Sequence, residues 1–130
     1  MEHLMKKIIL ITGGQRSGKS RYAEELALSL SDTPVYLATA HIWDEEFRQR
    51  VAMHQARRGD NWTNIEEEKH LSRHLIYNKV VVIDCITLWC TNYFYDRTAN
   101  EWEQHTVEEA LKNLQEEFDR FTEQEAVFIF

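Results

Sequence analysis

A glycine-rich loop near the start of the chain constrains the fold more than any other feature of the sequence. Its eight residues match the pattern G-x-x-x-x-G-K-[ST] and are Gly13, Gly14, Gln15, Arg16, Ser17, Gly18, Lys19 and Ser20. The apolar run 8–11 before the loop predicts a buried strand, and the spacing of Tyr22, Leu26 and Leu30 after it predicts a helix. A strand, this loop and a helix, in that order, form the context in which the pattern binds nucleotide phosphates.

The residue types of the loop suit that chemistry. Gly13 and Gly18 can adopt backbone angles closed to other residues, so main-chain N–H groups can approach an anion, and the helix start adds partial positive charge. We expect Lys19 to reach the β- and γ-phosphate oxygens and the Ser20 hydroxyl to bind a Mg²⁺ that bridges them. The alternative, an ordinary glycine-rich turn, does not require the strand and helix that flank the loop.

The composition excludes several classes of protein. The 130 residues are 43% hydrophobic and carry a net charge of −7, which fits one globular domain over 1–130 and argues against a nucleic-acid scaffold. No apolar stretch reaches the length of a membrane span, and residues 1–7 do not resemble a signal peptide, so we expect a cytoplasmic protein. Cys85 and Cys90 are too few for a disulfide framework and are expected to be reduced.

Strand and helix patterns alternate along the chain. We expect strands at about 7–12, 35–39 and 79–84 and from residue 126, helices at 19–31, 44–58, about 67–76, from about 87 and at about 101–123, and an irregular segment at 59–64. This alternation predicts an α/β fold with a mainly parallel sheet flanked by helices. Because 126–130 is typical of a strand that has just entered the sheet, we expect the domain to lack its C-terminal part.

A second candidate site residue lies at the end of a predicted strand. Ligands of open parallel sheets gather at the carboxyl ends of the strands. Asp84 closes the apolar run 80–83, and P-loop proteins use a carboxylate at this place to hold Mg²⁺, directly or through water. A metal site elsewhere has less support, because His70 and His74 are four residues apart in a predicted helix but no third ligand is evident.

One face of the predicted helix at 44–58 carries a cationic cluster. Arg50, His54 and Arg58 recur every four residues, and Arg57 follows His54 by three. Guanidinium groups bind phosphate oxygens in fork geometry, and their charge disfavours imidazolium, which would leave a neutral His54 nitrogen able to attack phosphorus. The alternative is an arginine-rich helix face that is exposed to solvent and carries a histidine without a catalytic role, which has the same spacing.

Several motifs in this order resemble one family, the bifunctional adenosylcobinamide kinases/adenosylcobinamide-phosphate guanylyltransferases of cobalamin biosynthesis. The resemblance covers about 8–92 and rests on T-G-G-Q-R-S-G-K-S-R at 12–21, Y-L-A-T-A at 36–40, the run from Asp44 through His54 to Arg58, Trp62 with Glu66, and D-C-I-T-L-W at 84–89 with Thr91-Asn92. Many members of the family have two adjacent histidines where this chain has Met53-His54, so His54 is the imidazole that this segment offers. The resemblance implies a P-loop NTPase fold of the RecA-like type and a homo-oligomer, a trimer.

The resemblance also implies a two-step enzyme. ATP or GTP first phosphorylates the hydroxyl of the aminopropanol arm of adenosylcobinamide; GTP then guanylylates a histidine, and the GMP passes to the new phosphate to give adenosylcobinamide-GDP. By position, His54 is the implied nucleophile, and Lys19 with Mg²⁺ would neutralise phosphate charge. The implied nucleotide contacts are the loop from Gly13 to Ser20 with Ala38, Thr39, Ala40, Gln55, Ala56, Arg57, Arg58, Glu66 and Asp84, and the implied Mg²⁺ ligands are Ser20 and Asp84.

Two other functions stay open from the sequence. A kinase with a single activity, acting on another small alcohol, would use the loop and Asp84 and leave His54 idle. A non-catalytic nucleotide-binding module would bind GTP without consuming it.

Overall fold

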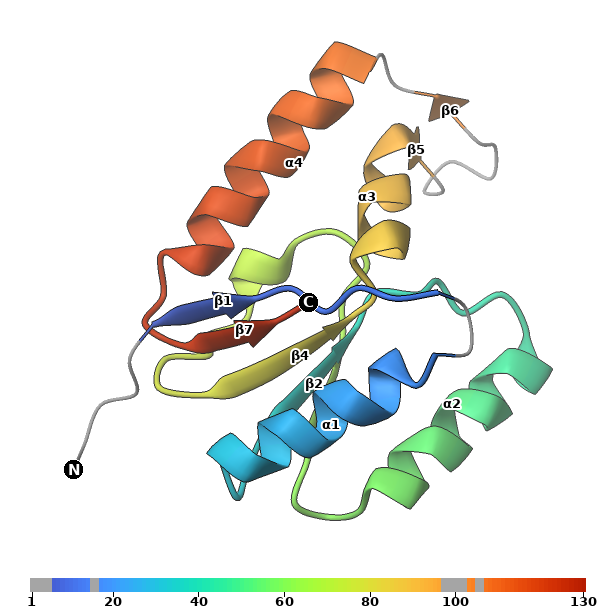
Figure 1. Ribbon diagram of the computed structural model, residues 1–130. Coiled ribbons are helices and arrows are strands. Elements are labelled where there is room, and N and C mark those ends of the chain that lie inside the picture. Colours follow the sequence, from blue (N-terminus) through green and yellow to red (C-terminus); the bar gives the residue numbers. More distant parts are fainter. Residues whose placement is uncertain (1–5, 15–16, 97–102, 105–106) are drawn as a thin grey trace.

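Parallel strands form the centre of the molecule (Figure 1). The computed structural model describes residues 6–14, 17–96, 103–104 and 107–130. In this part of the chain one parallel sheet has the strand order β1-β7-β4-β2-β3, with β1 at Lys7–Ile9, β2 at Val35–Ala38, β3 at Thr63–Glu66, β4 at Val80–Asp84 and β7 at Val127–Ile129. The predicted α/β class and the predicted parallel sheet are confirmed.

Helices cover both faces of this sheet (Figure 1). On one face lie α1 (Lys19–Leu30) and α2 (Glu45–Arg58), and on the other lie α3 (Ile86–Phe94), α4 (Val107–Thr122) and the short 3-10 helix η1 (Leu71–Arg73). Side chains of a strand alternate between faces, so in β2 Val35 and Leu37 join the core under α4, whereas Tyr36 joins the core under α1. None of the helices in the described ranges combines the length and the apolar composition that a membrane crossing requires.

Helices α4 and α1 bury side chains of different size against the sheet. Under α4, Phe121 and Phe128 are completely buried and meet edge to face with ring centroids 5.1 Å apart. Each such phenylalanine contributes about 1.5–3 kcal/mol when it is fully buried. Under α1 the buried helix residues are Ala23 and Ala27, which let α1 approach the strands closely. This packing holds the first turn of α1 beside the carboxyl ends of the strands.

Two segments differ from the sequence prediction by forming strands. Residues 63–66 form β3, which pairs with β2, although the prediction treats 59–64 as irregular. β3 is exposed along most of its length, so it lacks the apolar alternation that indicates a strand. The predicted helix at 101–123 begins only at Val107, because β6 (Glu103–Gln104) pairs antiparallel with β5 (Tyr95–Asp96). Strand pairing here overrides the helix preference of Glu and Gln.

The predicted helix at 67–76 is wrong. The segment contains turns and the short helix η1. The Glu67 carboxylate accepts hydrogen bonds from the backbone N–H groups of Lys69 (3.1 Å) and His70 (3.0 Å), which competes with a helical hydrogen-bond ladder. The Lys69 carbonyl also accepts hydrogen bonds from the side chains of Trp89 (2.9 Å) and Tyr93 (2.8 Å). The predicted helical pairing of the two histidines in this segment is therefore absent.

Glu67 makes this segment sensitive to pH. Burial of the carboxyl group opposes its ionisation, but the two backbone hydrogen bonds and the contact with His74 Nε2 at 3.1 Å outweigh burial, so the pKa of Glu67 lies below its usual value. A carboxyl group with a lowered pKa in the folded state stabilises the fold above its unfolded-state pKa of about 4.3. That stabilisation is lost as the pH falls through the folded-state pKa.

We expect Glu67→Gln to lower the free energy of unfolding at pH 7 by about 1–2 kcal/mol, because a neutral amide accepts weaker hydrogen bonds than a carboxylate. The difference from the wild type should narrow progressively below about pH 4, where the wild-type carboxylate takes up a proton. Urea unfolding of both proteins between pH 7 and pH 3 measures the two free energies. A difference that stays constant over this range would contradict a role for the charge.

Candidate functional site

The phosphate loop joins the carboxyl end of β1 to the start of α1 (Figure 1). Gly18 precedes α1 with a φ of +84°, in the left-handed region that glycine adopts without steric cost. A Cβ atom on Gly13 would lie 2.7 Å from Ser17 Oγ and 3.3 Å from Lys19 Cγ, so this glycine leaves room for the side chains of Ser17 and Lys19. α1 has no side-chain cap among the described residues, which leaves N–H groups of its first turn available to an anion.

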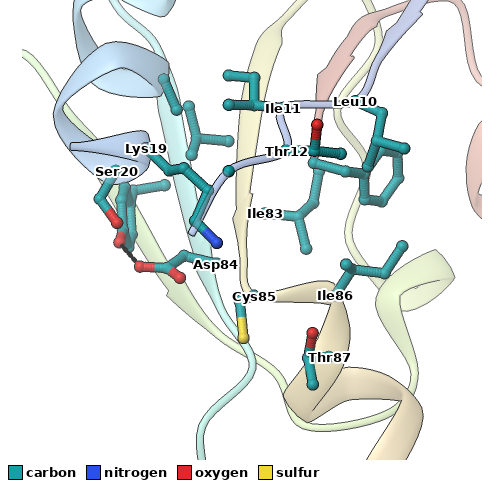
Figure 2. Close-up of a pocket in the computed structure, with 15 residues that line it drawn as sticks. Leu10, Ile11, Thr12, Lys19, Ser20, Ile83, Asp84, Cys85, Ile86 and Thr87 are labelled. Carbon is teal, nitrogen blue, oxygen red and sulfur yellow. Dashed lines mark hydrogen bonds between the residues drawn. The ribbon is translucent and has the colours of Figure 1, made fainter. Parts of the chain in front are cut away.

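A cavity of about 360 Å³ opens beside this loop and is called the phosphate-loop cavity (Figure 2). Lys19, Ser20 and Asp84 surround its polar end, and the Lys19 ammonium group is directed toward Asp84 (Figure 2). The other lining residues are Leu10, Ile11, Thr12, Gly13, Ala23, Tyr36, Val82, Ile83, Cys85, Ile86, Thr87 and Phe130. The cavity thus brings together three residues that are predicted from the sequence to bind phosphate and Mg²⁺.

Tyr36 holds the Asp84 carboxylate in place. Its hydroxyl group donates a hydrogen bond to Asp84 Oδ2. Burial of the phenol, together with the negative charge of Asp84, raises the pKa of Tyr36 well above its usual value. The hydroxyl group therefore remains a hydrogen-bond donor at neutral pH, and Oδ1 is the Asp84 oxygen left for a cation.

The polar end of the phosphate-loop cavity suits a Mg²⁺ ion. Mg²⁺ takes oxygen ligands, keeps several waters and is commonly bound by one or two protein side chains together with substrate phosphates. Ser20 offers a hydroxyl oxygen and Asp84 a carboxylate oxygen to the same cavity. No group of three or more His, Cys, Asp or Glu side chains in the described ranges could hold a metal ion by itself.

A second cavity, of about 470 Å³, adjoins the first and is called the histidine cavity. It is lined by Ser20, Arg21 and Glu24 of α1, by Phe47, Val51, His54, Gln55, Arg57 and Arg58 of α2, and by Tyr36, Ala38, Ala40, Asn64, Ile65, Asp84 and Leu88. Ser20, Tyr36 and Asp84 line both cavities. His54 therefore lines a cavity that shares these three residues with the phosphate-loop cavity.

His54 is exposed and is contacted by one of its arginine neighbours. Arg57 Nη2 donates a long hydrogen bond of 3.4 Å to His54 Nδ1. Because an arginine N–H group can only donate, Nδ1 is the acceptor nitrogen in this contact. The Nδ1 lone pair becomes available to another atom only when Arg57 moves away.

Arg58 has a different environment from Arg57. Only 9% of its side chain is exposed, its Cζ lies 3.6 Å from the centroid of the Tyr36 ring, and Nη2 donates to Asn64 Oδ1 at 2.8 Å. Nη1 lies 3.9 Å from Glu24 Oε1, and Nε is buried without a hydrogen-bond partner among the described residues. Arg58 thus joins the end of α2 to β2, β3 and α1, and its contact with a triphosphate stays a prediction.

The remaining predicted contact residues differ in their position. Ala38 and Ala40 line the histidine cavity, whereas the buried Thr39 hydroxyl donates to the Cys85 carbonyl at 2.8 Å and accepts from the Cys85 N–H at 3.0 Å. Thr39 therefore joins the ends of β2 and β4. The described residues among the predicted contacts that line neither cavity are Gly14, Ser17, Gly18, Thr39, Ala56 and Glu66. Gln15 and Arg16 lie outside the described residues.

Tyr36, Glu24 and Asn64 line the histidine cavity but are not among the site residues predicted from the sequence. A signal existed for Tyr36, because a tyrosine in a buried strand needs a partner for its hydroxyl group. A weaker signal existed for Glu24, which follows Ser20 by four residues and so shares a face of α1. Asn64 carried no signal, because the strand that positions it was not predicted.

Comparisons with known proteins confirm the resemblance that the motifs indicate. The family model "Cobinamide kinase / cobinamide phosphate guanyltransferase" matches residues 9–130. The bifunctional adenosylcobalamin biosynthesis protein CobU of Escherichia coli is 37% identical over 113 residues, which are 80% of this chain and 61% of the relative. The bifunctional adenosylcobalamin biosynthesis protein CobP of Pseudomonas aeruginosa is 44% identical over 87 residues, 64% of this chain and 50% of the relative. The CobU protein of Salmonella typhimurium is 33% identical over 114 residues, with coverages of 80% and 61%.

The chain spans only part of the length of these curated relatives. The matched residues cover 61%, 50% and 61% of the relatives' own sequences. The family model, by contrast, matches this chain from residue 9 to residue 130 and includes the phosphate loop, His54 and Asp84. The chain therefore belongs to the cobinamide kinase / cobinamide phosphate guanyltransferase family.

Proposed function

We propose that this protein phosphorylates adenosylcobinamide and then transfers GMP from GTP to the phosphorylated product, giving adenosylcobinamide-GDP. The observation that carries the proposal is the shared wall of the two cavities, formed by Ser20, Tyr36 and Asp84. A nucleotide whose phosphates lie in the loop can extend past this wall toward His54. The names of the relatives, bifunctional adenosylcobalamin biosynthesis proteins, support two activities in one chain.

The first step is a phosphoryl transfer. The hydroxyl oxygen of the aminopropanol arm attacks the γ-phosphorus of ATP or GTP, the bond to the nucleoside diphosphate breaks, and the hydroxyl proton leaves to solvent. Catalysis of such a transfer consists mainly of positioning and of stabilising charge on the phosphate oxygens. Lys19 and the N–H groups of the first turn of α1 supply this stabilisation. Mg²⁺ bound by Ser20 and Asp84 would add positive charge beside the same oxygens.

The second step uses His54 as a nucleophile. A nitrogen of His54 attacks the α-phosphorus of GTP, an N–P bond forms and pyrophosphate leaves. An oxygen of adenosylcobinamide phosphate then attacks the same phosphorus, the N–P bond breaks, and His54 is regenerated. Arg57 connects nucleotide binding to this chemistry. Its hydrogen bonds to a triphosphate are charge-assisted and stronger than its contact with a neutral imidazole, so an arriving nucleotide would draw it away from Nδ1.

The proposal also covers assembly and location. The family resemblance implies a homotrimer. Nucleoside triphosphates are its proposed substrates, and a cytoplasmic location follows from their supply there.

Product analysis tests the proposal against the two alternative functions. Adenosylcobinamide is incubated with the protein, ATP, GTP and Mg²⁺. The corrinoids are then separated by chromatography and identified by mass spectrometry. We expect adenosylcobinamide phosphate to form first and adenosylcobinamide-GDP to follow. A kinase with a single activity would stop at a phosphorylated alcohol, and a nucleotide-binding module would bind GTP and leave adenosylcobinamide unchanged. Either result would overturn the proposal.

A further inference from the structure

Tyr36 stands between the two cavities and lines both of them. The residue is 8% exposed, and its side chain extends from β2 on the face that α1 covers. Two parts of this side chain have separate partners. The hydroxyl group donates a hydrogen bond to Asp84, and the guanidinium group of Arg58 lies over the face of the ring. Each partner belongs to a different part of the proposed site.

The hydroxyl contact fixes the direction of the Asp84 carboxylate. Tyr36 pairs with Val82 of the neighbouring strand β4, and Asp84 lies two residues further along β4 on the same face. The χ2 torsion angle of an aspartate side chain has broad energy minima, so a carboxylate at a strand end can rotate. The hydrogen bond from the buried phenol selects one orientation, in which Oδ2 is occupied and Oδ1 is left for a cation.

The ring contact holds the end of the helix that carries His54. Arg58 is the last residue of α2, one turn after His54, and its Cζ lies 3.6 Å from the Tyr36 ring centroid. That distance is well inside the range of about 6 Å over which a guanidinium group is attracted to an aromatic face. Trp62 supports the same ring edge to face, with centroids 5.9 Å apart. Because α2 has no buried residue, its position depends on a small number of contacts of this kind.

We propose that Tyr36 is a positioning residue for both steps: its hydroxyl group orients Asp84 for nucleotide-bound Mg²⁺, and its ring, through Arg58, holds His54 at the histidine cavity. The second half rests on the proposed function, because it assumes that His54 is the nucleophile. The first half concerns nucleotide binding and can be measured without any reaction.

Tyr36→Phe tests the hydroxyl contact alone, because phenylalanine keeps the ring under Arg58. We expect the Mg²⁺ concentration that half-saturates binding of a fluorescent, non-hydrolysable GTP analogue to rise by about 10-fold, the effect of losing one hydrogen bond to a charged group. At saturating Mg²⁺, the rate at which GTP labels His54 should stay near the wild-type rate. An unchanged Mg²⁺ requirement would overturn the role of the hydroxyl group.

Tyr36→Leu tests the ring contact, because leucine removes the ring and leaves Arg58 itself intact. At saturating Mg²⁺ we expect the rate of His54 labelling to fall by about 10- to 100-fold, since a displacement of about 1 Å at a reacting group can have an effect of this size. Equal labelling rates in Tyr36→Phe and Tyr36→Leu would overturn the role of the ring.

Tyr93 provides matched controls for both variants. It is 4% exposed, lies in the core under α4, and donates a hydrogen bond of 2.8 Å to the Lys69 carbonyl. Tyr93→Phe and Tyr93→Leu should lower the melting temperature comparably and change neither the Mg²⁺ requirement nor the labelling rate at temperatures where the protein is folded. If they change both quantities as the Tyr36 variants do, the effects at Tyr36 are those of lost stability and the proposal is wrong.

Absence of label on the wild-type protein would overturn the proposed function and the role of the ring. The Mg²⁺ titration would still decide the role of the hydroxyl group, because it measures nucleotide binding without any reaction.

Discussion

In the His54→Ala variant, GTP labelled at the α-phosphate is expected to leave no label on the protein, whereas the wild type becomes labelled through an acid-labile bond. Removal of the attacking nitrogen eliminates the covalent step, so the labelling rate should fall by at least about 10³-fold. Phosphorylation of adenosylcobinamide by ATP should continue, because Lys19, Ser20 and Asp84 are unchanged. The separate loss of one activity is the result that a kinase with a single activity does not predict.

The structure offers a close control for this experiment. His54 is exposed, so its removal should change the free energy of unfolding by less than about 0.5 kcal/mol. His70 is also exposed and lines neither cavity, so His70→Ala should retain both the label and the phosphorylation. Label that persists on His54→Ala at the wild-type level would assign the nucleophile to another residue.

The parts of the site that the sequence predicted are those that depend on the local path of the backbone. Gly13 and Gly18 belong to a loop whose spacing fixes where Lys19 begins α1, and that geometry is found in the structure. Asp84 was predicted because an apolar run identifies a buried strand, and the residue after such a run lies at the edge of the sheet where ligands bind. These features need no knowledge of which strands are neighbours.

The parts that were missed depend on tertiary contacts. Arg57 and Arg58 follow His54 by three and four residues, and helical spacing alone gives both of them the same proximity to it. Their difference arises because β2 lies beside β3, which places the Tyr36 ring and Asn64 around Arg58 and leaves Arg57 exposed. Likewise, no helix starts at residue 67, because the Glu67 carboxylate accepts hydrogen bonds from the backbone N–H groups of Lys69 and His70. Neither the order of strands in a sheet nor a hydrogen bond between a side chain and a nearby backbone N–H group produces a periodic pattern in a sequence.

The difference between the two arginines also refines the proposed chemistry. Arg57 can exchange its contact with His54 for a phosphate group without disturbing the fold, because both side chains are exposed. Arg58 would have to leave a hydrogen bond, a charged neighbour and an aromatic face to do the same. Phosphate binding near His54 is therefore better assigned to Arg57, and Arg58 to holding α2 in place.

In the Lys19→Met variant, both steps are expected to slow by about 10²–10³-fold, because one preorganised charge on the phosphates is removed while side-chain length is kept. Phosphoryl transfer from ATP and labelling of His54 by GTP are measured separately at saturating Mg²⁺. Lys19 is exposed at the start of α1, so the fold should tolerate the change. Lys112→Met, on the exposed face of α4 and outside both cavities, is the matched control and should leave both rates unchanged.

The comparison of the two steps in Lys19→Met tests whether one loop serves both nucleotides. His54→Ala removes the second step alone, so a parallel loss in Lys19→Met would mean that the triphosphate attacked by His54 is held by the same phosphate loop. Slow phosphoryl transfer with normal labelling would mean that GTP binds its triphosphate within the histidine cavity instead, near Arg21 and Arg57. Ser20, Tyr36 and Asp84 line both cavities and therefore favour the first outcome. A nucleotide that lies against these three residues can contact the phosphate loop and His54 at the same time.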